Sequence, residues 1–198
     1  AAVKRALEAA PNDPAAIQVL EELLATAETR AQAAVMLDTI YGEVGSHKKQ
    51  IEVIQVRVAT AAAKGDRLAL YGRLAEVYEK IGDNASAFEV LTKAAGEFPA
   101  ELPIWDRLAV VSNRTQKSQQ FVEALVQAVP PTGDTGLPER VEMDLSERIA
   151  TLYDEMLGQI DEARPYLERI LNRDPSNERA FHRLKQILTT REKWDELE

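Results

Sequence analysis

The sequence contains no cysteine, which excludes disulfide bonds and thiol chemistry. Aromatic residues make up only 6% of the chain, and glycine and proline number nine each among 198 residues. No apolar run approaches the roughly 18–20 residues that a membrane-spanning helix needs. Glycine and proline lie between segments of apolar periodicity rather than in runs of their own, which favours helices joined by short turns.

Positive charge is also scarce, since 24 Lys and Arg residues are outnumbered by 33 Asp and Glu residues and the net charge is −9. Binding to phosphate backbones or anionic lipid needs clustered positive charge, so we expect neither a nucleic-acid nor a membrane partner. No signal peptide is visible, and we expect a cytoplasmic protein. Both ends of the sequence look like interrupted helices, so we expect a segment of a longer array.

Apolar residues recur with helical spacing through nearly the whole chain. The stretch IEVIQVRV at 51–58 resembles a strand, but its flanks extend a helical pattern and we predict a helix there. The predicted helices cover residues 14–28, 31–44, 47–64, 67–82, 84–97, 101–114, 117–129, 138–157, 161–172, 177–190 and 193 onward.

An arginine directly before an aliphatic residue recurs along the sequence. The letters GRLA at 72–75 return as DRLA at 106–109, ERIA at 147–150 and HRLK at 182–185. The aliphatic residues of these motifs are 34, 41 and 35 residues apart. Such a period predicts helix hairpins that stack on one another, because a single hairpin cannot bury its apolar face alone.

Residues 68–100 resemble a tetratricopeptide repeat, a helix hairpin of about 34 residues with defined aromatic, small and Leu positions. The resemblance rests on Tyr71, Leu74, Ala75, Tyr78, Gly82, Asp83, Ala87, Leu91, Ala94 and Pro99. It implies an all-α fold, a right-handed α-solenoid of stacked antiparallel helix hairpins. It also implies that five aromatic side chains lie in the core, namely Tyr71, Tyr78, Trp105, Tyr153 and Phe181.

The resemblance implies a single repeat array over residues 1–198. Its expected parts are the tail of a preceding repeat at 1–13, irregular helices at 14–66, repeats at 68–100, 102–130 and 138–176, and a truncated repeat at 177–198. The 138–176 repeat has one extra residue, which we place in the turn near Leu157 and Gly158.

Two regions depart from the repeat pattern. Asp38, Gln50 and Arg57 stand where small residues are expected, and the helix at 31–44 pairs with either neighbour, so we expect an irregular, three-helix unit between residues 14 and 66. The stretch PPTGDTGLP at 130–138 is either a plain connecting loop or a hinge or ligand-contacting loop.

The sequence offers little chemistry. Its two histidines, His47 and His182, have no ligand-spaced partners, and the acidic residues are predicted on solvated helix faces. We therefore expect no catalytic residue, no metal and no cofactor, and do not expect an enzyme.

The resemblance places the residue before each core Leu or Ile on the first helix of a hairpin, facing a concave groove. The candidate ligand-binding residues are Arg73, Glu76, Lys80, Arg107, Arg114, Arg148 and Arg183. Arginines in such positions offer planar two-donor forks to the carboxylates of an acidic peptide. The alternative is that their stems cover apolar edges while local acids neutralise their heads, such as Glu76 for Arg73 and Asp144 for Arg148.

The expected function is that of a non-enzymatic scaffold that binds a peptide or partner protein in the concave groove, with a possible preference for an acidic partner. The alternative is an architectural or self-associating spacer within a larger multidomain protein, forming a homo-oligomer through exposed solenoid ends.

Overall fold

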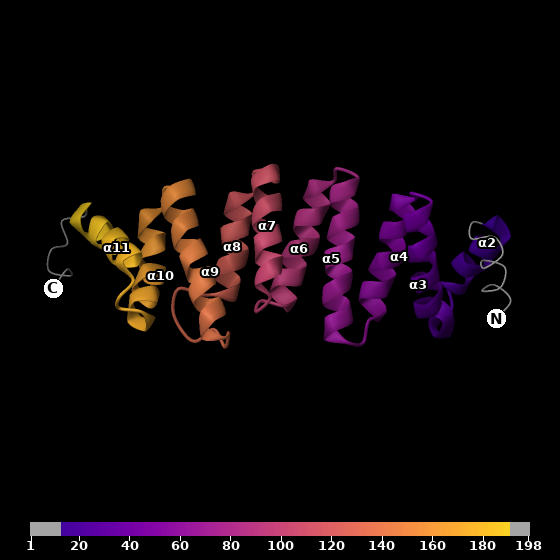
Figure 1. Ribbon diagram of the computed structural model, residues 1–198, viewed down its shortest axis with the longest axis horizontal. Helices are drawn as coiled ribbons and strands as arrows, with labels where there is room; N and C mark the ends of the chain where they lie inside the picture. Colours follow the sequence, from indigo (N-terminus) through magenta and orange to yellow (C-terminus); the bar gives the residue numbers. More distant parts are fainter. Residues whose placement is uncertain (1–12, 191–198) are drawn as a thin grey trace. The chain divides into compact units, whose positions relative to one another are not determined.

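The structure, a computed structural model, describes residues 13–190, and each regular element in that range is a helix (Figure 1). The prediction of an all-α fold built from tetratricopeptide-like helix hairpins is confirmed. The chain divides into two compact units, Ala1–Leu91 and Thr92–Glu198. They are called unit 1 and unit 2 below and are described separately. The expected helix from residue 193 onward, and nearly all of the repeat tail at 1–13, lie outside the described residues.

Unit 1 contains α2 (Pro14–Leu23), α3 (Ala27–Glu43), α4 (His47–Thr60), α5 (Lys64–Lys80) and the first part of α6 (Asn84–Glu97). Helix α3 packs against both α2 and α4, and α4 packs against α5. The core around α3 is formed by Leu20, Ala33, Ala34, Leu37, Ile40, Tyr41 and Val53.

Two tight corners in unit 1 have the same geometry. Gly45 after α3 and Gly82 after α5 adopt positive φ angles of 71° and 80°. A residue with a Cβ rarely adopts this conformation, and it lets the following amide turn back onto the helix end. The amides of Ser46 and Asp83 accordingly donate to the carbonyls of Tyr41 and Tyr78, each at 2.9 Å. These corners fold the chain back and begin the second helix of each hairpin.

Helix α2 ends earlier than the predicted helix over residues 14–28. Helix α2 stops at Leu23, and α3 begins at Ala27 instead of residue 31. The reason is that side chains, instead of further backbone amides of the same helix, donate to the carbonyls at this helix end. The Thr29 hydroxyl donates to the Leu23 carbonyl at 2.8 Å, and Arg30 Nε donates to the Leu24 carbonyl at 2.8 Å. Two side chains from the following helix thus complete the helix end.

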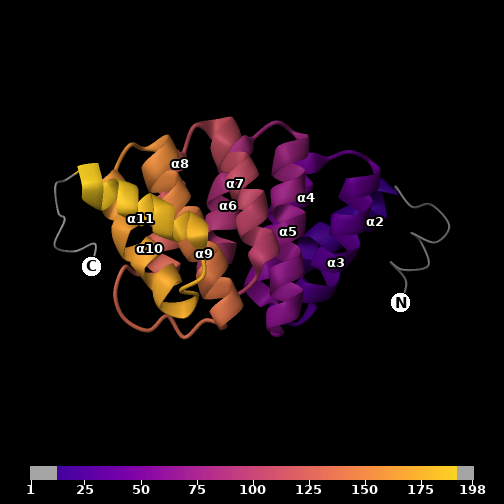
Figure 2. The same cartoon turned by 60° about the vertical axis from the view of Figure 1, so that its left-hand side comes forward.

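Unit 2 contains the remainder of α6, α7 (Leu102–Thr115), α8 (Ser118–Ala128), α9 (Glu139–Thr151), η1 (Leu152–Met156), α10 (Ile160–Arg173) and α11 (Glu178–Thr190). Trp105 is fully buried, and its indole N–H donates to the Pro99 carbonyl at 2.9 Å. The segment between α8 and α9 is an open loop (Figure 2).

The predicted helix at 138–157 is continuous but changes geometry in its last turn. Residues Leu152–Met156 form a π-helix, which accommodates one residue more per turn than an α-helix. We attribute to this turn the extra residue that the sequence places near Leu157 and Gly158. The π-turn carries Asp154 and Glu155, which contact the next hairpin as described below.

The aromatic core prediction holds for Tyr71 and Trp105, which are buried, and fails for Phe181, which is 50% exposed. Helix α11 instead buries Ala180, Ile187 and Leu188. Phe181 lies seven residues before Leu188 and on the same side of α11, and of the two only Leu188 is buried. Tyr78 and Tyr153 are half-buried.

Candidate functional site

The arginines of the repeated motif lie on the first helices of the hairpins. Arg73 is on α5, Arg107 on α7, Arg148 on α9 and Arg183 on α11. Three of them precede a buried aliphatic residue, namely Leu74, Leu108 and Ile149. The motif therefore marks the border between the core and the exposed face of each first helix. That face, on α3 and α5 in unit 1 and on α7, α9, η1 and α11 in unit 2, is called the first-helix face below.

In unit 1 the arginine belongs to a polar cluster centred on Asp38, a fully buried residue of α3. Arg73 donates to Asp38 Oδ1 from Nε at 3.1 Å and from Nη2 at 2.8 Å. Gln50 Nε2 donates to the same oxygen at 3.0 Å, and Arg57 Nη1 pairs with Asp38 Oδ2. One buried carboxylate thus holds two guanidinium groups and an amide. These four residues are called the Asp38 cluster.

Three residues of the Asp38 cluster correspond to alanines of the next hairpin. Asp38, Gln50 and Arg57 lie 37 residues before Ala75, Ala87 and Ala94, which are all buried. Such positions converge where the two helices of a hairpin cross closely, so the polar side chains that replace the alanines meet as well. Gly42 makes room for them, because a Cβ atom there would lie 2.9 Å from Gln50 Nε2.

Arg57 and Arg73 line an open recess of about 420 Å³ in unit 1. Arg57 comes from α4, the second helix of its hairpin, and reaches the first-helix face through the Asp38 cluster. The other lining residues are mostly small or aliphatic: Ala31, Val35, Thr60, Ala61, Ala62, Asp66, Ala69 and Leu70. The recess therefore has an apolar wall and a cationic end.

In unit 2 Arg148 bridges two first helices. Its Nη2 lies 2.6 Å from Asp106 Oδ1 on α7, and its Nε lies 2.5 Å from Asp144 Oδ1 on α9. Burial alone would lower the pKa of Arg148, but hydrogen bonds to Asp144 and Asp106 raise it above its ordinary value. This arginine is a fixed cation that ties α9 to the hairpin before it.

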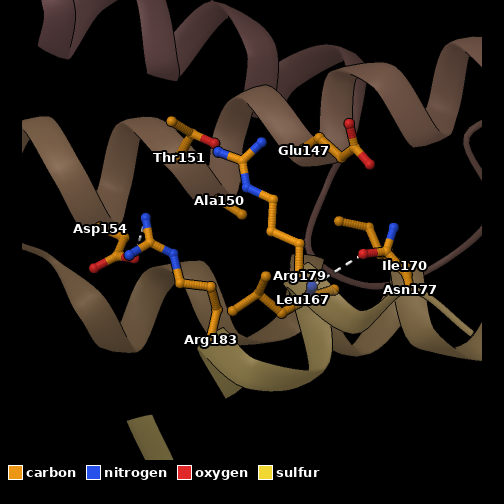
Figure 3. A pocket seen from close by; sticks show the side chains of 10 residues that line it. Glu147, Ala150, Thr151, Asp154, Leu167, Ile170, Asn177, Arg179 and Arg183 are labelled. Carbon is orange, nitrogen blue, oxygen red and sulfur yellow. Dashed lines mark hydrogen bonds and ion pairs between the residues drawn. The ribbon is translucent and has the colours of Figure 1, made fainter. Parts of the chain in front are cut away.

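Arg183 makes the same kind of link from α11 to the π-turn. Its Nη2 lies 2.9 Å from Asp154 Oδ2 and also pairs with Glu155. Figure 3 shows Arg183 pointing toward Asp154, while Arg179 extends toward Thr151 across a pocket of about 40 Å³. A pocket of that volume holds only a few water molecules. Its floor is apolar and is formed by Ala150, Leu167, Ile170 and Ala180.

The structure separates the predicted site residues into distinct environments. Arg73 joins the Asp38 cluster, whereas Arg148 and Arg183 each have their own acids. Glu76 and Lys80 are exposed on α5. Arg107 on α7 is half-buried, and Arg114 in the last turn of that helix is exposed.

Sequence reasoning did not place Asp38 and Arg57 among the site residues. The sequence feature that could have indicated this cluster is the set of three polar residues, Asp38, Gln50 and Arg57, at positions of one hairpin where small residues are expected.

The three described arginine clusters differ in formal charge. Arg57 and Arg73 with Asp38 leave a surplus of one positive charge. Arg148 with Asp106 and Asp144 leaves a surplus of one negative charge. Arg179 and Arg183 balance Asp154 and Glu155. The arginines therefore do not form a uniform cationic surface.

Two tetratricopeptide-repeat family models match the chain, one over residues 68–100 and one over residues 147–177. The chain contains tetratricopeptide repeats. Repeats of this family generally mediate protein–protein interactions. In the structure the first matched repeat consists of α5 and α6, and the second extends from α9 through η1 to α10.

Several solved tetratricopeptide-like structures are similar to the chain at low identity. A crystal structure of MamA is 17% identical, with 84% of this chain and 85% of that chain covered and a TM-score of 0.44. The TPR-like repeats of a putative kinesin light chain from Podosopora anserina are 23% identical, with 85% and 90% covered and a TM-score of 0.43. No curated protein matches the chain. Because these identities and TM-scores are low, the family assignment rests on the two repeat matches.

None of the helices between residues 13 and 190 is long and apolar enough to cross a membrane. In the same part of the chain, no group of three or more His, Cys, Asp or Glu residues is placed to hold a metal ion.

Proposed function

We propose that the chain is a non-enzymatic scaffold that binds a peptide or a partner protein on its first-helix face. The observation that carries this proposal is the recess of unit 1, where two arginines and a wall of small aliphatic residues meet in an open volume of about 420 Å³. An open surface with apolar contacts and a few fixed polar groups suits an extended chain.

Two described carboxyl groups, Glu21 and Asp83, are unsuited to act as general acids near neutral pH. A general acid near neutral pH needs a raised carboxyl pKa. Hydrogen bonds from Lys49 and Tyr41 lower the pKa of Glu21, and hydrogen bonds from the Ser86 amide and hydroxyl lower the pKa of Asp83. Both groups are held as carboxylates and stabilise the fold.

The test is selection of binding peptides from a random-heptapeptide display library, followed by amide chemical-shift mapping of a selected peptide on the isotope-labelled chain. We expect the perturbed amides to lie on α3 and α5 or on α7, α9 and α11. Peptides that perturb only exposed positions of second helices such as α4 and α10 would contradict the proposal.

A matched pair of variants sharpens the mapping. Val35 on α3 lines the recess and is 49% exposed, and Val19 on α2 is 40% exposed outside the recess lining. Val35→Arg should abolish binding of peptides that map to unit 1, because the long side chain fills the recess. Val19→Arg should leave their affinity unchanged. Equal effects of the two substitutions would place the binding surface elsewhere.

A further inference from the structure

We propose that the recess of unit 1 binds an acidic side chain of an extended peptide, with the carboxylate held between Arg57 and Arg73. The small residues along the wall then contact an aliphatic side chain next to the acidic one. This inference rests on the proposed function and specifies the chemistry of the partner. The occupant is an internal Asp or Glu of a partner protein, flanked by a small aliphatic residue.

The charge at the two arginines favours an anionic occupant. Within residues 13–190, Asp38 is the acid that lies within ion-pair distance of Arg57 and of Arg73. One carboxylate cannot neutralise two guanidinium groups, so one positive charge remains. A carboxylate from outside balances it and adds hydrogen bonds of the charge-assisted kind. The surplus favours an anionic group over a neutral one.

The two arginines are accessible to solvent, and the acid that holds them is buried. The side chain of Arg73 is 45% exposed and that of Arg57 is 25% exposed, whereas Asp38 is 1% exposed. Arg73 uses Nε and Nη2 for Asp38, and Arg57 uses Nη1. The remaining nitrogen of Arg73 and the remaining two of Arg57 have no partner in the Asp38 cluster. A ligand thus meets donors on two arginines, while the acid that holds them stays inside.

The contacts with Asp38 preorganise both arginines for a ligand. Arginine side chains lose considerable rotamer freedom when a ligand orders them, and this loss weakens binding. The bidentate contact of Arg73 and the pairing of Arg57 with the buried carboxylate already restrict both side chains. Asp38 therefore acts as a positioning residue, since it orders the two arginines without touching the ligand.

The recess combines an apolar wall with the two arginines. Ala31 and Val35 on α3 and Ala69 and Leu70 on α5 provide its apolar wall. Asp66, the one acidic residue of this lining, lies seven residues before Arg73 on the same helix, which is about 10 Å along the axis. At that separation physiological salt screens most of its interaction with an anion at the arginines. An acidic side chain at one end and an aliphatic side chain at the wall fit this arrangement.

Unit 2 provides an internal comparison. Arg148 is held by two acids, and Arg179 and Arg183 are held by two others. Neither cluster has a positive surplus, so neither should select an acidic group. The preference for acid is expected at the unit 1 recess and not at these arginines.

The experiment compares peptides selected from a random-heptapeptide library by the wild-type chain, by Arg73→Gln and by the control Lys93→Gln, which changes an exposed residue of the second helix α6. The wild type and the control should enrich peptides with an internal Asp or Glu beside Ala, Val or Leu. Arg73→Gln should lose this enrichment. Far-UV circular dichroism checks that each variant folds.

A change made in the peptide keeps the test independent of protein folding. Replacing the selected Glu by Gln should weaken binding to the wild type by at least about tenfold, because a hydrogen bond to a charged group is lost. Chemical-shift mapping should place the Glu peptide against α3 and α5.

The results that overturn the inference are distinct from those that overturn the proposed function. Peptides that bind the first-helix face without acidic enrichment, or with equal affinity for Glu and Gln, overturn the inference alone. A requirement for a free C-terminal carboxylate or for phosphoserine also overturns it, since the occupant is then a different group. Selection of no peptide at all overturns both.

Discussion

For the Asp38 cluster we predict that a single substitution destabilises the chain more than a triple substitution does. Replacing Asp38 alone by alanine removes the acid that holds Arg57 and Arg73 together. Two cations then remain close to each other, and the amide of Gln50 loses its 3.0 Å contact with the carboxylate and keeps the 3.5 Å contact with the backbone carbonyl of residue 38. We expect Asp38→Ala to destabilise the chain more than removal of the polar groups together.

The magnitude follows from burial. Removing one partner of a buried ion pair costs about 3–5 kcal/mol. Because the arginines are 25% and 45% exposed, water solvates part of their charge after the substitution. We therefore expect the lower end, about 3 kcal/mol, which corresponds to a fall in melting temperature of about 6–12 °C for a chain of this size.

The assay is guanidinium unfolding of three variants, followed by far-UV circular dichroism. The first is Asp38→Ala. The second is the triple variant Asp38→Ala, Gln50→Ala and Arg57→Ala, which reproduces the buried alanines of the next hairpin. The third is the control Asp106→Ala, which removes an acid that is 62% exposed from Arg148 and should cost less than about 1 kcal/mol.

The triple variant should be more stable than Asp38→Ala by at least about 1 kcal/mol, because it leaves no buried group unpaired at these three positions. If the free energy of unfolding of Asp38→Ala is within about 1 kcal/mol of the wild-type value, the buried ion pairs of the cluster do not stabilise the chain as expected. If the triple variant is the least stable of the set, the reasoning about unpaired charge is refuted.

Three further predictions concern separate contacts. Gly42→Ala should be close to neutral alone but stabilising by up to about 1 kcal/mol in a Gln50→Ala background, because the 2.9 Å clash with Gln50 is then absent. Denaturant unfolding measures both effects, and equal effects in the two backgrounds would exclude this packing. Glu21→Gln should lower stability at neutral pH. This loss of stability should vanish as pH falls through the lowered pKa of Glu21, which lies below the ordinary value of 4.5. A loss that persists at acidic pH would contradict a stabilising role of the ionised Glu21 carboxylate. Burial raises the pKa of Tyr166 to about 12, so its contribution to stability is present below the ordinary value of 10.0 and is lost as pH rises toward 12. Alkaline unfolding should thus be less pH-dependent in Tyr166→Phe, and identical profiles would argue against it.

The hairpin architecture was predictable because its determinants are local or periodic. Helical apolar spacing predicts the helices, and Gly45 and Gly82 occupy the corners that require positive φ angles. The link from Arg148 to Asp144 was also predictable, because the two residues are four positions apart on one helix.

The partners across hairpins were not predictable from spacing. Local spacing associates Arg73 with Glu76, yet the carboxylate that holds Arg73 is Asp38, 35 residues earlier. Which acid an arginine reaches depends on how one hairpin stacks on the previous one, and this offset is set by packing in three dimensions. The π-turn at Leu152–Met156 is a similar case, since the sequence indicates an extra residue but not where the helix absorbs it.

The alternative that local acids neutralise the arginines is correct for Arg148, whose partners include Asp144. In the described clusters the arginines link successive first helices, so they have a structural role whether or not a ligand contacts them. What distinguishes Arg73 is the second arginine beside it and the single acid that the two share.

The most direct test of the account is a double-mutant cycle across the interface. The affinities of a selected Glu peptide and its Gln counterpart are measured by titration calorimetry on the wild type and on Arg73→Gln. We predict that the Glu-to-Gln change weakens binding at least about tenfold on the wild type and at most about twofold on Arg73→Gln, because the interaction that it removes is already absent from the variant. An equal loss on both proteins would contradict a carboxylate bound at the Asp38 cluster.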